Sequence, residues 1–137
     1  MSRRRIDVFF YGLFMDVELL RGKGIEPADV RPASVRGFSL RIGRRATLAP
    51  AANGIAYGLV MELTHDEVEK LYAEPSVREY RPEAVLVELA DGSRRPALCF
   101  NLARGPAAAD ANAEYAAKLR ALAGRVGLPA DYVRSIR

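Results

Sequence analysis

The stretch from Ile6 to Tyr11, closed by Gly12, constrains the fold of this chain more than any other segment. The run is apolar, rich in β-branched and aromatic residues, and too short for a buried helix, so it predicts a strand inside a sheet. Asp16, followed by apolar residues, predicts a short helix that begins there. The resulting turn and helix start could hold an anion such as a carboxylate through unpaired amides; an ordinary strand-to-helix connection is the alternative.

Two other local signals are strong. Thr64 followed by Glu67 is a capping box, and it predicts a helix that continues until Pro75 stops it. Glu74 then occupies the end of that helix, where a carboxylate faces the negative end of the helix dipole. Asp91-Gly92 predicts a two-residue hairpin turn.

The remaining pattern predicts an α+β domain. Alternating or β-rich runs predict strands, whereas Gly-, Pro- and Asn-containing stretches predict loops. Gly58, inside one of these strands, predicts a bulge or a close approach of another backbone. The expected strands are 33–43, 54–63, 84–89 and 95–102, the expected irregular segments are 22–32 and 44–54, and the expected C-terminal helices are 110–126, capped by Gly127, and 129–136.

Length and cysteine content favour one domain, 1–137, in a reducing compartment. Residues 1–5 are expected to form a flexible basic tail. The single cysteine, Cys99, cannot form an internal disulfide and is predicted to be a small core residue, so we expect a cytoplasmic protein. No apolar run approaches the roughly 20 residues that span a bilayer, and no membrane association is expected.

The net charge of +4 comes mostly from scattered arginines, including the pairs Arg44-Arg45 and Arg94-Arg95. No dense basic block with interleaved aromatic residues is present, so a solvated surface is favoured over a nucleic-acid surface. A basic nucleic-acid accessory domain is the weakest of the alternatives.

The residues also bear on which chemistry is expected. One histidine, His65, and one cysteine make no zinc site, and neither a phosphate-binding nor a dinucleotide-binding glycine motif is present. We therefore expect neither a metal nor a cofactor. Any reaction would use carboxylates, tyrosines, backbone amides and the substrate's own groups.

Several segments, taken in order, resemble the γ-glutamylcyclotransferase-like superfamily, in its avirulence-induced-gene-like branch. Tyr11-Gly12-Leu13 is similar to the family's Tyr-Gly-Ser/Thr signature, and Leu71 to Glu74 is similar to its Leu-Asp-x-x-Glu segment. The other similar segments are Arg36–Leu40, Tyr57–Leu63, Tyr80–Val87 and Gly127–Tyr132. The resemblance covers roughly residues 6–133.

This resemblance implies a small mixed β-barrel flanked by helices, in a monomer or homodimer. It implies cyclisation of a γ-glutamyl amine or peptide to 5-oxoproline with release of the amine. Carried over by position, Glu74 would be the general acid/base. The backbone from Tyr11 through Gly12 and Leu13 to Phe14 would bind the substrate's α-carboxylate and carbonyl, and the side chains of Tyr80 and Tyr115 would line the cavity.

The chain departs from the family pattern at four places. Leu13 replaces a serine or threonine, Pro75 replaces the glycine after the glutamate, and Tyr72 replaces an aspartate; residues 97–100 lack a tyrosine that many members carry. The altered turn and Pro75 favour an alternative, a non-catalytic member of the same fold that binds a small ligand or a protein.

Overall fold

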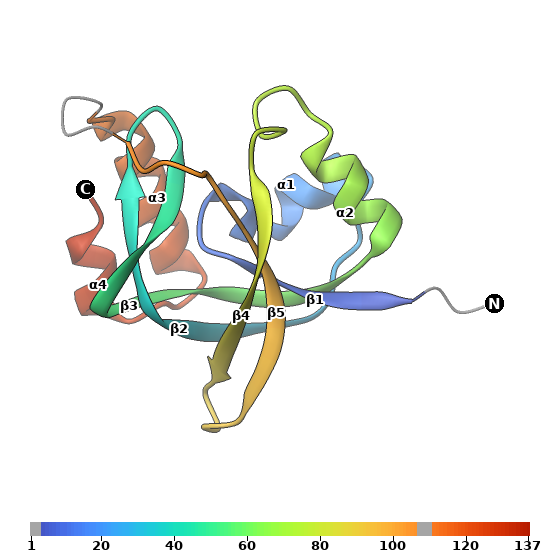
Figure 1. The fold of residues 1–137 in the computed structure, drawn as a ribbon, viewed down its shortest axis with the longest axis horizontal. Coiled ribbons are helices and arrows are strands. Elements are labelled where there is room, and N and C mark those ends of the chain that lie inside the picture. The colour runs from blue at the N-terminus through green and yellow to red at the C-terminus, as the bar shows by residue number, and fades with distance from the viewer. Residues whose placement is uncertain (1–3, 107–110) are drawn as a thin grey trace.

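The computed structural model describes residues 4–106 and 111–137. It shows a closed barrel of five strands with helices packed outside it (Figure 1). The strand order is β1-β3-β2-β4-β5, and β5 closes the barrel by pairing parallel to β1 while the other pairs are antiparallel. This confirms the expected mixed barrel. The elements are β1 (Arg5–Phe10), η1 (Leu13–Met15), α1 (Val17–Gly22), β2 (Ala28–Ile42), β3 (Ala46–Thr64), α2 (His65–Tyr72), β4 (Arg81–Leu89), β5 (Arg94–Asn101), α3 (Ala113–Arg125) and α4 (Ala130–Ser135).

Strand β1 is buried on both faces, because it lies between the barrel interior and the helices. Phe9 and Tyr11 point into the interior, where they pack with residues of all the other strands, including Cys99. Val8 and Phe10 face the opposite way and pack with helical residues such as Leu119. A segment buried on both faces shows a continuous apolar run, as Val8 to Tyr11 does, whereas the first residues of β1, from Arg5 to Asp7, are exposed or half-buried.

The hairpin of β2 and β3 is much longer than the sequence predicted. Strand β2 begins at Ala28 inside the expected loop 22–32, and β3 includes most of the expected irregular segment 44–54. The long ladder accommodates the turn-forming residues through a register shift between Arg36 and Phe38, where Gly37 has φ +87°. Gly54 is part of the strand because it has no side chain to block the Phe38 carbonyl oxygen, which lies 2.4 Å from the position of a Cβ.

Short sequence motifs correctly predicted the positions of the helices and of the β4–β5 hairpin, with small differences at their ends. The capping box of Thr64 and Glu67 is present, although α2 ends at Tyr72, so Glu74 lies two residues beyond the helix rather than in its last turn. The hairpin turn at Asp91-Gly92 is present, with Gly92 at φ +85°, but three residues, Ala90 to Gly92, rather than the predicted two separate the hydrogen-bonded Leu89 and Ser93. The cap at Gly127, with φ +84°, is confirmed. The predicted start of α3 at residue 110 falls outside the described residues, and Asn112 caps the helix.

The predicted N-terminal tail overlaps the barrel by one residue. Arg5 is the first residue of β1 and pairs with Thr64, and residues 1–3 lie outside the described part of the chain. The helices form two groups, with α1 and α2 toward one end of the barrel and α3 and α4 toward the other (Figure 1). The turn after β1 lies next to both groups, because it leads into α1 and packs against α3.

Candidate active site

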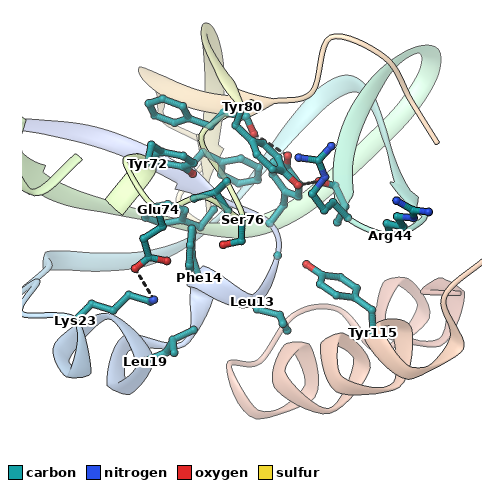
Figure 2. Close-up of a pocket in the computed structure, with 18 residues that line it drawn as sticks. Leu13, Phe14, Leu19, Lys23, Arg44, Tyr72, Glu74, Ser76, Tyr80 and Tyr115 are labelled. Atoms are coloured by element: carbon teal, nitrogen blue, oxygen red, sulfur yellow. Dashed lines mark hydrogen bonds and ion pairs between the residues drawn. The ribbon is translucent and has the colours of Figure 1, made fainter. Parts of the chain in front are cut away.

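A cavity of about 340 Å³ opens where β1 ends (Figure 2). Its walls come from segments far apart in the sequence: the turn after β1, the end of α1, the β2–β3 turn, the loop after α2, β5 and α3. All seven residues that the sequence proposed for the site lie on this wall: Tyr11, Gly12, Leu13, Phe14, Glu74, Tyr80 and Tyr115.

The turn after β1 satisfies several of its amides internally. The Met15 and Asp16 amides donate to the carbonyls of Gly12 and Leu13 at 3.0 and 3.1 Å. The Asp16 carboxylate caps α1 by accepting from the next helical amides, Glu18 at 3.1 Å and Leu19 at 3.3 Å. These amides at the start of α1 are therefore occupied, and an anion in the cavity would have to use the backbone between Tyr11 and Phe14.

Tyr115 reaches this turn from α3. Its hydroxyl lies 2.9 Å from the position that a Cβ on Gly12 would occupy, so residue 12 has no room for a side chain unless Tyr115 moves. Burial raises the pKa of Tyr115, and a hydrogen bond with the Leu13 backbone partly offsets that rise.

Glu74 lies at one side of the cavity with a basic partner. Its Oε1 is 2.7 Å from Nζ of Lys23, the C-cap residue of α1. The side chains are 35% and 27% exposed, respectively, so the pair is half-buried. Figure 2 shows Arg44 on the opposite side of the cavity. Glu74 thus has one oxygen held by an ammonium and a second, Oε2, for which no hydrogen bond is seen among the described residues.

Aromatic side chains form the apolar wall. Tyr72 stacks on Phe100 with ring centroids 3.8 Å apart and contacts Phe14 edge-on at 6.0 Å. The Tyr80 hydroxyl donates to the Ala46 carbonyl, so it ties the loop after α2 to β3. These rings make much of the cavity wall apolar, and a mostly apolar wall with a few polar groups is usual for a small-molecule site.

Tyr11 contributes to the site mainly through its backbone. Its ring is buried in the barrel, and its hydroxyl donates to the Phe100 carbonyl at 2.7 Å. Burial strongly raises the pKa of Tyr11. The side chain therefore stabilises the barrel end that carries the turn.

An alkaline titration should reveal this set of buried phenols. Burial raises the pKa of five tyrosines, to about 12 for Tyr80 and Tyr132. The tyrosines of the unfolded chain ionise near pH 10, and the buried tyrosines of the folded chain ionise at higher pH. Their contribution to the free energy of unfolding is therefore complete below pH 10 and is lost as pH rises from 10 toward 12. Ultraviolet absorbance should show these phenols still largely protonated at pH 10, while guanidinium-unfolded protein titrates normally; identical curves would contradict the prediction. The five residues are Tyr11, Tyr72, Tyr80, Tyr115 and Tyr132.

Sequence reasoning missed the basic residues of the site. Lys23 is 51 positions from Glu74, and no sequence spacing connects the two. Arg44 and Arg45 were assigned to a solvated surface, yet both line the cavity from the β2–β3 turn. A prediction that extended both strands to a tight turn at 43–45 would have placed these arginines together at one end of the hairpin. Tyr72 was predicted on the apolar face of the helix that precedes Pro75 and as a departure from a family motif, but not as a residue of the site.

Two further properties concern possible metals and membranes. Within residues 4–106 and 111–137, no three His, Cys, Asp or Glu side chains come together as metal ligands. No helix in the same ranges has the length and apolar character needed to cross a membrane.

Comparison with known proteins agrees with this fold. The family model described as "Gamma-glutamyl cyclotransferase, AIG2-like" matches residues 8–118. The fold is similar to a structure titled "Gamma-glutamyl cyclotransferase" (TM-score 0.78, 17% identity, 98% of this chain and 89% of that one). It is also similar to an uncharacterized Homo sapiens protein (0.76, 18%, 97% and 88%) and to an AIG2-like protein of Mus musculus (0.59, 15%, 81% and 90%). No curated protein sequence matches the chain.

Proposed function

The chain belongs to the γ-glutamyl cyclotransferase, AIG2-like family, and from this membership we propose that it converts a γ-glutamyl amine or peptide to 5-oxoproline and free amine. The observation that carries the proposal is the shared cavity of Glu74 and the Gly12 turn. Its volume of about 340 Å³ suits a ligand of dipeptide size.

The reaction requires little from the protein beyond proton transfer and positioning. The α-nitrogen of the substrate forms a bond to its own γ-carbonyl carbon, and the bond from that carbon to the leaving nitrogen breaks. Two protons pass from the α-ammonium to the leaving nitrogen, which departs as an ammonium. A carboxylate such as Glu74 can carry both protons in turn, and it ends in the ionisation state in which it began.

Ring closure also depends on conformation. A flexible γ-glutamyl chain must fold back on itself, and well-oriented intramolecular reactions reach effective molarities of about 10⁵–10⁸ M. The stacked rings of Tyr72 and Phe100 line the same cavity as the turn, so a bound chain would be confined by both. Backbone amides near Gly12 would stabilise the oxyanion that develops on the γ-carbonyl.

The departures from the family pattern bear on this proposal. Leu13 supplies no hydroxyl, so recognition at that position would rely on the backbone. Pro75 restricts the backbone directly after Glu74, while the carboxylate itself is held by its ion pair with Lys23. The alternative, a non-catalytic member that binds a ligand in the same cavity, rests on the same two residues.

A product assay separates the two candidates. The protein should form 5-oxoproline from at least one member of a panel of γ-glutamyl dipeptides and γ-glutamyl amines. Products would be quantified by chromatography, with each substrate incubated alone to correct for spontaneous cyclisation. Binding of panel members without 5-oxoproline would favour the non-catalytic alternative.

Lys23 should act as a positioning residue for Glu74. Lys23→Met removes the 2.7 Å ion pair and frees the carboxylate to move, so we expect kcat to fall by about 10-fold. KM should change by less than about 2-fold, and Lys23→Arg should recover part of the rate, because it restores a cation. A rise in KM at constant kcat would instead indicate that Lys23 binds the substrate.

A further inference from the structure

We propose that Arg44 selects γ-glutamyl compounds whose leaving part carries an anionic group, such as the carboxylate of an amino acid, over those with a neutral amine. The inference rests on the proposed function for the orientation of the ligand. It assigns a specificity-determining role to the β2–β3 turn.

The charges on the cavity wall are unbalanced. Three cations, Lys23, Arg44 and Arg45, line the cavity with one carboxylate, Glu74. Lys23 forms an ion pair with Glu74 at 2.7 Å. Arg45 forms an ion pair at 3.1 Å with Glu79, which does not line the cavity. Among the described residues, Arg44 forms no ion pair, and it is exposed at the cavity's edge.

The backbone beneath Arg44 is well fixed. Ile42 pairs with Ala46 at the end of the β2–β3 ladder, and the Gly43 amide donates to the Arg45 carbonyl at 3.1 Å. Arg45 also lies 6.0 Å from the Tyr80 ring centroid, which holds the neighbouring side chain against the wall. The guanidinium of Arg44 therefore extends from a tight, anchored turn.

The cavity has distinct ends. Figure 2 shows Glu74 and Lys23 at one end, Arg44 at the other, and Leu13 and Tyr115 between them. If Glu74 and the turn bind the γ-glutamyl group, as proposed, the rest of the ligand extends toward Arg44. A γ-glutamyl group has one ammonium and one carboxylate and is neutral overall. A carboxylate on the leaving part gives the ligand a net negative charge and a partner for the unpaired guanidinium.

The test uses a ligand pair that cannot react. N-glutarylalanine and N-glutarylalaninamide keep the chain and its terminal carboxylate but lack the amine nucleophile, and they differ only in the charge of the leaving part. Calorimetry on the wild type should give a Kd about 5- to 10-fold lower for the anionic ligand, because only that ligand pairs with the Arg44 guanidinium. The expected difference is modest because Arg44 is exposed, and exposed ion pairs are weaker than buried ones. Arg44→Gln should reduce that ratio to about 1–2 with little change for the amide. Added salt should reduce the wild-type ratio.

Arg36→Gln is the matched control, because Arg36 is an exposed arginine of β2 that does not line the cavity. It should retain the wild-type ratio. Equal loss of both ligands in Arg44→Gln would overturn the proposal, since Arg44 would then bind the glutaryl carboxylate; so would a wild-type ratio near one or no binding of either ligand. Because neither ligand can cyclise, this binding test does not depend on turnover. Selective binding here, together with no 5-oxoproline from any member of the γ-glutamyl panel, would reject the enzymatic reaction while supporting this role of Arg44.

Discussion

Glu74→Gln is expected to lower the rate of 5-oxoproline formation by about 10²- to 10⁴-fold, the usual contribution of a general acid/base. Glutamine keeps the shape of the side chain and its proximity to Lys23 but cannot accept the proton of the α-ammonium. KM should change little, because the turn and the aromatic wall, which would confine the ligand, remain intact. Steady-state assays on the best substrate of the panel would measure both constants.

The fold should survive this substitution. The Lys23–Glu74 pair is half-exposed, and such pairs contribute at most about 1 kcal/mol to the free energy of unfolding. Circular dichroism and thermal unfolding would verify this. Glu69→Gln is the matched control, since Glu69 is an exposed carboxylate of α2 away from the cavity wall, and it should keep wild-type activity. Full activity in Glu74→Gln would assign the proton transfer to another group.

Gly58→Ala is expected to have the largest effect on stability. A Cβ at this position would lie 2.1 Å from the Phe10 carbonyl oxygen and 3.0 Å from the tip of the Phe9 ring. The oxygen belongs to the backbone of β1, which is held between β3 and β5, so it cannot move aside cheaply. Overpacking of this kind costs about 3 kcal/mol or more.

Such a loss is a large part of the stability of a domain of this size, so Tm should fall by roughly 10 °C or the protein should not fold. Gly124→Ala provides the control, because no atom lies within 4 Å of a Cβ at that position in α3. This second substitution should stabilise the protein by up to about 1 kcal/mol, through helix propensity. Equal unfolding temperatures for Gly58→Ala and the wild type would contradict the close approach of β1 and β3.

The candidate site was partly predictable from the sequence. The Tyr11-Gly12 turn and Glu74 were proposed from motif order, and the structure places them around one cavity. The cationic residues were not predictable, because Lys23 reaches Glu74 only through the packing of α1 beside the loop that follows α2. Arg44 reaches the cavity only because β2 and β3 extend to a turn at 43–45, and the sequence placed an irregular segment there.

The physical reason for that error lies in the barrel. Alternation of buried apolar and exposed polar residues identifies a strand when one face meets water. In the part of β3 that was missed, residues 46–48 are all buried and residues 49–55 are all exposed or half-buried, so neither stretch alternates. Pro50 and the Asn53-Gly54 pair, which usually mark turns, are tolerated in β3 beside the register shift at Gly37.

The apolar run of β1 predicted a strand, although its hydrogen bonds are made with the distant strands β3 and β5. Residues only a few positions apart predicted the capping box of α2, the Asp91-Gly92 turn and the glycine cap of α3. Each of these arises from short-range hydrogen bonds and backbone preferences that any tertiary context retains. Which charged groups meet in the cavity depends on the three-dimensional fold, because closing the barrel through the parallel β1–β5 pair fixes the relative positions of segments distant in sequence.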